Sequence, residues 1–141
     1  IEPSRGLGDV YKRQDNMRVK QSIDLGGMRL APYSPCIVVG DQIWVAGQIG
    51  TDGGESLREQ AKRALDKIEG LLVQAGSSKS DLVKVTVLLI DMKDFSDFNE
   101  IYGEWLEGTV LPARAAFAVK ELPGQAKVEV VAEAVLGSGG I

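Results

Sequence analysis

Apolar and polar residues change their spacing several times along the chain, and these changes predict its elements. Two short runs rich in β-branched and other apolar residues, 36–39 and 42–49, predict strands. Gly40 and Asp41 between them suit a tight turn, so the two runs are expected to form a hairpin. The glycine-rich segment 47–54 lacks the Gly-Lys-Ser/Thr ending of a phosphate-binding loop. We interpret it as an ordinary connection from a strand to a helix.

The next segment has the spacing of an amphipathic helix. Ser56 and Glu59 have the S-x-x-E spacing of a capping box, which marks the start of a helix. Apolar residues then recur at helical intervals as far as Gly76, where the helix is expected to end. This stripe consists of Leu57, Ala61, Ala64, Leu65, Ile68, Leu71, Leu72 and Ala75. The charged residues lie off the stripe, and we expect them to face solvent.

The second half of the chain predicts one more helix and three more strands. Residues 82–90 are rich in β-branched side chains and too apolar for an exposed edge, so they predict a central strand. Asp94 is expected to cap a second helix that has one aromatic face, which we assign to the core. That face comprises Phe95, Phe98, Ile101, Tyr102 and Trp105. Two further strands are predicted at 113–119 and 127–135.

The resulting order, β-hairpin-α-β-α-β-β, predicts an α+β fold with a single mixed β-sheet covered by two helices. A loop containing Pro123 and Gly124 separates the last two strands, which suggests that they pair as an antiparallel hairpin. Side chains alternate along the first of these strands. Phe117 and Val119 then belong in the core under the helices, and Arg114 points to the opposite face of the sheet.

The composition limits the partners and the reactive groups that we expect for this protein. A chain of 141 residues can bury a core as one domain without metals or disulfides, and its formal charge of -4 argues against nucleic acid as a partner. There is no histidine, so the commonest metal ligand and general base are absent, and we expect no metal. The single cysteine, Cys36, is assigned to a buried strand rather than to a nucleophile. No apolar run is long enough to cross a bilayer, so no membrane contact is expected.

Arg114 is the main candidate for a functional residue. Small alanines flank it and leave space, and a guanidinium can bind a carboxylate through two hydrogen bonds. The expected hairpin places Glu129 near it. The two residues form either a functional pair or a structural ion pair, and spacing alone slightly favours the structural one. By position alone, Tyr33 packs its ring in a loop bounded by prolines and Asn99 is a surface polar residue.

Five segments, in this order and spacing, resemble the Rid family, the YjgF-like reactive-intermediate (imine) deaminases, also described as endoribonuclease L-PSP-like. They are PYSP, VAGQIG, DFNEIYGEWL, LPARAAFAV and KVEVVAEAV. The resemblance covers residues 19–136, which we take as the domain. Residues 1–18 are interpreted as an N-terminal tail outside the family pattern, and 137–141 as a short C-terminal tail.

This resemblance implies a chorismate-mutase-like fold, a homotrimer and pockets between neighbouring subunits. It implies a 2-iminobutanoate/2-iminopropanoate deaminase, which hydrolyses enamine/imine intermediates such as 2-aminoacrylate to 2-keto acids and ammonia without a cofactor. By position, Arg114 would grip the substrate carboxylate together with the backbone N–H of Ala116, and Glu129 would orient or activate water. The other pocket residues that match by position are Tyr33, Gly47 and Asn99.

The chain departs from the family pattern at Ala46, where many deaminating members carry a serine whose hydroxyl lines the pocket. The departure bears on substrate range and rate. It keeps open an alternative function, a non-catalytic trimer that binds small carboxylates or acts on client proteins as a chaperone-like regulator. RNA cleavage, an activity attributed to some relatives, is less favoured because of the acidic charge and the absence of histidine. We expect a cytoplasmic location, with a mitochondrial one also open.

Overall fold

The computed structural model describes residues 18–26 and 31–140, which form six strands and two α-helices joined by loops and short 3-10 turns. Residues 1–17, most of the predicted N-terminal tail, lie outside the described residues. The strands are β1 (Gln21–Ile23), β2 (Cys36–Val39), β3 (Gln42–Ile49), β4 (Leu82–Leu89), β5 (Ala113–Ala118) and β6 (Val128–Val135). The helices are α2 (Leu57–Gln74) and α3 (Phe95–Trp105).

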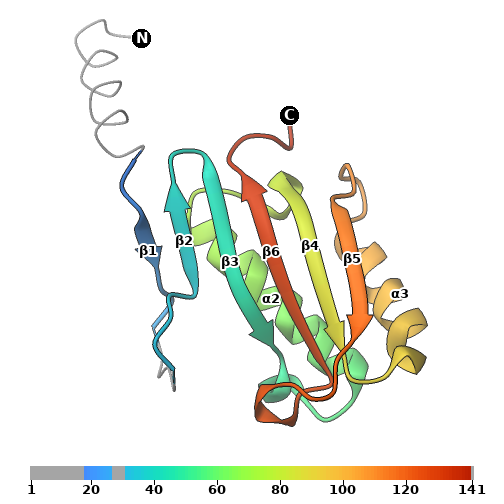
Figure 1. The fold of residues 1–141 in the computed structure, drawn as a ribbon. Helices are drawn as coiled ribbons and strands as arrows, with labels where there is room; N and C mark the ends of the chain where they lie inside the picture. The colour runs from blue at the N-terminus through green and yellow to red at the C-terminus, as the bar shows by residue number, and fades with distance from the viewer. Residues whose placement is uncertain (1–17, 27–30, 141) are drawn as a thin grey trace, which may run out of the picture.

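The strands form one mixed sheet in the order β1-β2-β3-β6-β4-β5, and Figure 1 shows both helices against the same face of it. The predicted α+β class is therefore confirmed, and the short strand β1 is an addition to the predicted order. The predicted hairpin is also confirmed, since β2 and β3 pair antiparallel with Val39 opposite Gln42. We call the face that carries the helices the covered face and the other the open face.

The predicted hairpin of the last two strands is wrong. Strand β5 pairs parallel with β4, whereas β6 lies between β3 and β4 and pairs antiparallel with both. The reason is the helix between β4 and β5. Because α3 packs against the covered face, it carries the chain back to the end where β4 began, so β5 must run parallel to β4. Strand β5 is thereby left at the edge of the sheet.

The predicted orientation of β5 is also wrong. The parallel register places Arg114 beside Val85, which is 1% exposed, and places Phe117 beside Leu88. Arg114 therefore lies on the covered face, and Phe117 lies on the open face with 49% of its surface exposed. Alternation specifies only that these two residues face opposite ways. Because the intervening side chains are alanines that fit either face, the packing of α3 decides which way each one points.

The two helices begin differently. The capping box of α2 is confirmed: Ser56 Oγ accepts from the Glu59 N–H at 3.1 Å, and Glu59 Oε1 accepts from the Ser56 N–H at 3.2 Å. The predicted cap of α3 is wrong, because Asp94 makes no side-chain capping bond. Its backbone already has helical dihedral angles, whereas a capping residue is normally extended. Asp91 is extended and caps the preceding turn by accepting from the Lys93 N–H at 2.9 Å.

The core lies between the helices and the covered face of the sheet. Its largest fully buried side chains include Ile43, Leu65, Ile68, Leu89 and Phe98. Cys36 is fully buried there, and burial raises the pKa of its thiol to about 11, which confirms the assignment of this residue to a buried strand. None of the helices in the described part of the chain is long and apolar enough to cross a membrane.

Candidate functional site

Arg114 is held by one stripe of α3. Its Nη1 donates to Asn99 Oδ1 at 2.7 Å, and its Cζ lies 5.5 Å from the ring centre of Phe95 and 5.0 Å from that of Tyr102. The three partners are four and three residues apart, so they share one side of the helix. The partly buried guanidinium thus has an amide and two aromatic rings as its neighbours.

The charge of Arg114 has no acidic partner within residues 18–26 and 31–140, where every ion pair involves other cations. On α2, by contrast, Arg63 donates to Asp52 at 2.9 Å and Lys67 lies 2.8 Å from the same carboxylate. The hydrogen bond from Lys67 is the main reason that the pKa of Asp52 falls to about 2. A guanidinium has five N–H donors, so Arg114 keeps most of them available for an anion after binding Asn99.

Ala116 lies two residues beyond Arg114 and faces the same side of the sheet. Next to β5, the Val119 N–H donates to Leu89 O at 2.7 Å, which directs the N–H of Val119 towards β4. Since backbone N–H groups alternate along an extended strand, the N–H of Ala116 is directed away from β4, towards the outer edge. The structure therefore brings Arg114, Asn99 and the backbone of Ala116 together at one edge of the sheet.

Glu129 lies on the open face of β6, together with Gly47 of β3. The β3–β6 register shifts between Val45 and Gln48, so Gly47 lies within an irregularity of the strand. A Cβ atom added to Gly47 would lie 2.7 Å from the carboxyl carbon of Glu129, so the carboxyl group occupies space that a side chain at position 47 would need. Partial burial raises the pKa of Glu129 above the ordinary value of a glutamate.

Arg114 and Glu129 do not meet within one chain. On β4, which lies between them, Arg114 is opposite Val85 and Glu129 is opposite Leu88. These two positions are three residues apart, so the side chains point to opposite faces of the sheet. The structural ion pair that the sequence favoured is therefore wrong for the single chain. We call the Arg114 group the cationic half-site and the Glu129–Gly47 group the carboxylate half-site.

Tyr33 lies apart from Arg114. It is in the loop before β2, near the edge of the sheet opposite to the one formed by β5. It is half exposed and borders a cleft of about 360 Å³. Gln48, the neighbour of Gly47, also lines this cleft, as do Arg63 and Lys67. The cleft borders α2, which packs on the covered face, whereas Gly47 meets Glu129 on the open face, so the structure does not bring Tyr33 together with Glu129 within one chain. The two cations of the cleft are already paired with Asp52.

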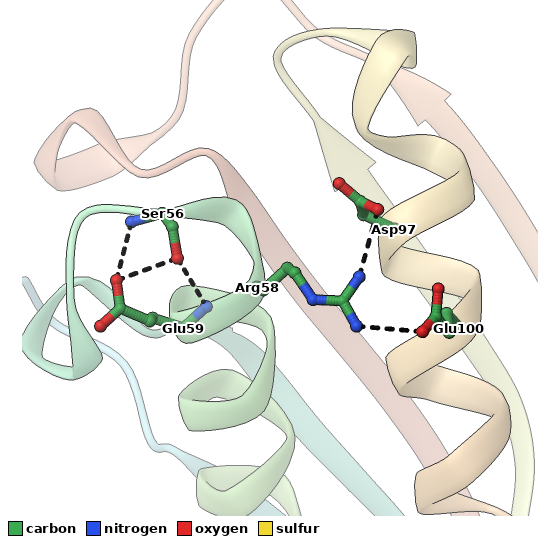
Figure 2. A network of polar contacts seen from close by, with 5 residues as sticks. All are labelled: Ser56, Arg58, Glu59, Asp97 and Glu100. Carbon is green, nitrogen blue, oxygen red and sulfur yellow. Dashed lines mark hydrogen bonds and ion pairs between the residues drawn. The ribbon is translucent and has the colours of Figure 1, made fainter.

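A bridge between the helices anchors α3, which carries Asn99. Figure 2 shows Arg58 of α2 reaching across to α3, where it donates to Asp97 at 3.1 Å and to Glu100 at 3.2 Å. These contacts are exposed, so each stabilises only weakly. They lie on the side of α3 away from the stripe that holds Arg114, so the helix is held from both sides.

From the sequence, Phe95 and Tyr102 are expected in the core alone, and their contact with Arg114 is not expected. A signal was present, because Asn99 falls between them on the same helical stripe. It could not be used without knowing which face of β5 carries Arg114. Among the described residues, no three His, Cys, Asp or Glu side chains lie close enough together to hold a metal ion.

Comparisons with known proteins agree with this architecture. The family described as Endoribonuclease L-PSP matches residues 28–136. The chain is 41% identical over 114 residues, 77% of this chain and 84% of the other, to a mouse protein named 2-iminobutanoate/2-iminopropanoate deaminase. The structure of YyfA from Yersinia pestis, described as a member of the conserved Rid protein family, has a TM-score of 0.78 at 30% identity and covers 84% of this chain and 100% of that one. The structure of E. coli TdcF with bound serine has a TM-score of 0.76 at 29% identity and covers 82% and 98%.

The match over most of the chain shows the family. The protein belongs to the Endoribonuclease L-PSP family, which is the Rid, or YjgF-like, family that its sequence resembles.

Proposed function

We propose that the protein hydrolyses small enamine or imine intermediates that carry a carboxylate, such as 2-aminoacrylate, and releases a 2-keto acid and ammonia. The observation that carries the proposal is the cationic half-site, in which a partly buried guanidinium is held only by neutral groups. Such a cation favours an anionic ligand. The name of the mouse relative and the serine bound to TdcF agree with a small substrate that has a carboxylate.

In this proposal Arg114 binds the substrate carboxylate through two parallel hydrogen bonds, and the N–H of Ala116 donates a third. This fixes the position of the C=N bond relative to the protein, which converts an encounter into an oriented reaction. Asn99 and the two rings of α3 hold the guanidinium while it binds.

Glu129 would transfer protons during the reaction. An enamine such as 2-aminoacrylate first becomes the imine, as its methylene carbon gains a proton and its nitrogen loses one. Water then adds to the imine carbon, and one proton of that water passes through the Glu129 carboxyl group to the imine nitrogen. The tetrahedral intermediate then loses ammonia as its C–N bond breaks and its hydroxyl becomes the carbonyl of the keto acid. A carboxyl group whose pKa is raised by burial exchanges protons more readily near neutral pH, so it suits this role.

The complete site would form between copies of the chain. Arg114 and Glu129 occupy opposite faces of one sheet, so one copy supplies the cationic half-site and its neighbour the carboxylate half-site. The homotrimer with intersubunit pockets, which the family resemblance implies, would provide this arrangement. The open face supports it, because it exposes large apolar side chains such as Trp44 and Phe117.

The test is to generate 2-aminoacrylate from serine with a serine dehydratase and to follow the release of pyruvate. The wild type should accelerate release over buffer, and Arg114→Ala should return it to the buffer rate. Arg63→Ala is the matched control, because it removes a cation that is already paired with Asp52. A wild type no faster than buffer, or an Arg114→Ala variant as fast as wild type, would show the proposal to be wrong.

The departure at Ala46 favours one second candidate, a non-catalytic protein that binds small carboxylates or client proteins. Such a protein would bind pyruvate through Arg114 without any turnover, and Glu129→Gln would leave its activity unchanged. Adding the hydroxyl back with Ala46→Ser separates the two candidates further, because only a deaminase can gain rate from it.

A further inference from the structure

We infer that Phe95, Asn99 and Tyr102 form a neutral cradle that sets the plane of the Arg114 guanidinium, and that Tyr102 is a positioning residue for the proposed reaction. The inference rests on the proposed function and deepens it. We call these three residues the α3 cradle.

The geometry of the α3 cradle is specific to the guanidinium. Two ring centres lie 5.0 and 5.5 Å from Cζ, and the amide oxygen of Asn99 lies 2.7 Å from Nη1. The rings attract the cation through their π faces, and the amide fixes the direction of one N–H. A flexible arginine side chain is thereby restricted to one orientation before any ligand arrives, which reduces the entropy lost on binding.

The neutrality of the cradle matters as much as its shape. A carboxylate in place of Asn99 would hold the guanidinium equally well but would neutralise its charge. The rings and the amide orient the group and leave its charge for the ligand. By contrast, Arg63 and Lys67 both form ion pairs with the carboxylate of Asp52.

The ring of Tyr102, rather than its hydroxyl, makes this contact. The side chain is 6% exposed, and its hydroxyl is buried without a hydrogen-bond partner among the described residues. The ring also stacks against Phe98, with 5.6 Å between ring centres and 28° between planes. Phe98 is fully buried, so the core fixes Tyr102 and Tyr102 in turn fixes Arg114.

This arrangement predicts which kinetic constant depends on the cradle. The carboxylate of the substrate is the same in the ground state and the transition state, so its binding contributes to both equally. Loss of uniform binding raises KM and leaves kcat nearly unchanged. A merely structural role for Tyr102 would instead lower the amount of folded protein and leave KM as it was.

The experiment compares Tyr102→Leu, Tyr102→Phe and Phe98→Leu in the 2-aminoacrylate assay, with pyruvate binding measured by calorimetry. Tyr102→Leu should raise KM and the Kd for pyruvate by about tenfold, the effect of losing a partly desolvated cation–π contact. Tyr102→Phe keeps the ring, so both constants should stay near those of the wild type. Phe98→Leu keeps an apolar side chain against the ring, so it should lower Tm and should change both constants less than Tyr102→Leu does.

Three outcomes would overturn the inference: wild-type constants in Tyr102→Leu, equal losses in Tyr102→Leu and Tyr102→Phe, or equal losses in Tyr102→Leu and Phe98→Leu. The failure of the proposed function looks different. In that case the wild type has no turnover, and the Kd for pyruvate in the same four proteins still decides whether the cradle positions Arg114.

Discussion

Arg114 and Glu129 lie on opposite faces of one sheet, and their surroundings differ as much as their positions. The guanidinium is fixed by a hydrogen bond and two rings from α3. The carboxyl group lies in a space that exists because Gly47 has no side chain, and partial burial raises its pKa. The cationic half-site is built to hold one orientation and one charge. In the proposed reaction, the carboxylate half-site changes its protonation state.

This difference suggests a division of labour between the half-sites. Changes to the cationic half-site should affect substrate binding, because its charge and geometry do not alter during the reaction. Changes to the carboxylate half-site should affect the rate and its pH dependence. Experiments can test this division, and the first one asks whether two copies of the chain must contribute residues to the same site.

The largest expected effect is a recovery of activity in mixed oligomers. Arg114→Ala and Glu129→Gln should each be nearly inactive alone. When equal amounts are unfolded and refolded together, a site between copies can take Arg114 from one chain and Glu129 from the other. Random assembly should restore about a quarter of wild-type activity, measured as pyruvate release.

Two controls accompany this mixture. Each variant refolded alone should stay nearly inactive, and the two mixed without unfolding should stay nearly inactive as well while their subunits do not exchange. A co-assembled mixture that remains inactive would contradict a site shared between copies.

The second effect concerns Glu129→Gln. The variant should lose about 100-fold in kcat with little change in the Kd for pyruvate, because only proton transfer is removed. In the wild type, kcat should fall as pH decreases through the raised pKa of Glu129, at a higher pH than for an ordinary glutamate. This acid limb should be absent from the pH profile of the variant, and its persistence there would assign the limb to another group.

The same pKa shift has a consequence for stability. A raised pKa means that the folded state disfavours the ionised carboxylate, so Glu129 lowers stability progressively as the pH rises from its ordinary pKa to its folded pKa, and by the full amount above that. Glu129→Gln should therefore have a higher Tm than the wild type near neutral pH. The difference should shrink as pH falls through the raised pKa towards the ordinary one, where the wild-type group becomes protonated. Thermal unfolding at a series of pH values measures this.

A third effect, about tenfold in kcat, is expected for Gly47→Ala. The added Cβ would collide with the carboxyl group of Glu129 and displace it from its position. Pyruvate binding at the cationic half-site should be unaffected. Gly103→Ala is the matched control, since a Cβ at this position in α3 meets nothing within 4 Å. The substitution also removes a glycine from a helix. It should keep full activity and gain about 1 kcal/mol of stability.

The smallest effect is expected for Arg58→Ala, which removes the exposed bridge between α2 and α3 (Figure 2). Tm should decrease slightly, and KM should stay within about twofold of the wild type, because the α3 cradle and the core still hold the helix. Asn99→Ala provides the comparison, since it removes the hydrogen bond to Arg114 and should raise KM further. Equal KM values in the two variants would show that the cradle does not depend on its amide.

Local patterns in the sequence predicted the elements well. The capping box of α2, the β2–β3 hairpin and the apolar run of β4 were predicted correctly because each depends on contacts between residues close in sequence. The cap of α3 was predicted wrongly because Asp91 and Asp94 are both suitable residues, and only the backbone angles decide between them. Arg114 and Glu129 were selected from residue type, position and family resemblance, and their proposed roles stay predictions.

By itself, the sequence determined the fold class, the boundaries of α2 and the family, because periodicity, capping residues and motif spacing are properties of short segments. Only the tertiary structure decided the order of the strands and the face on which Arg114 lies. Alanines flank this arginine in LPARAAFAV and fit either side of a sheet, so no local preference opposes either orientation. The packing of α3 against the covered face makes β5 parallel to β4, turns Arg114 towards Phe95, Asn99 and Tyr102, and leaves Glu129 on the other face.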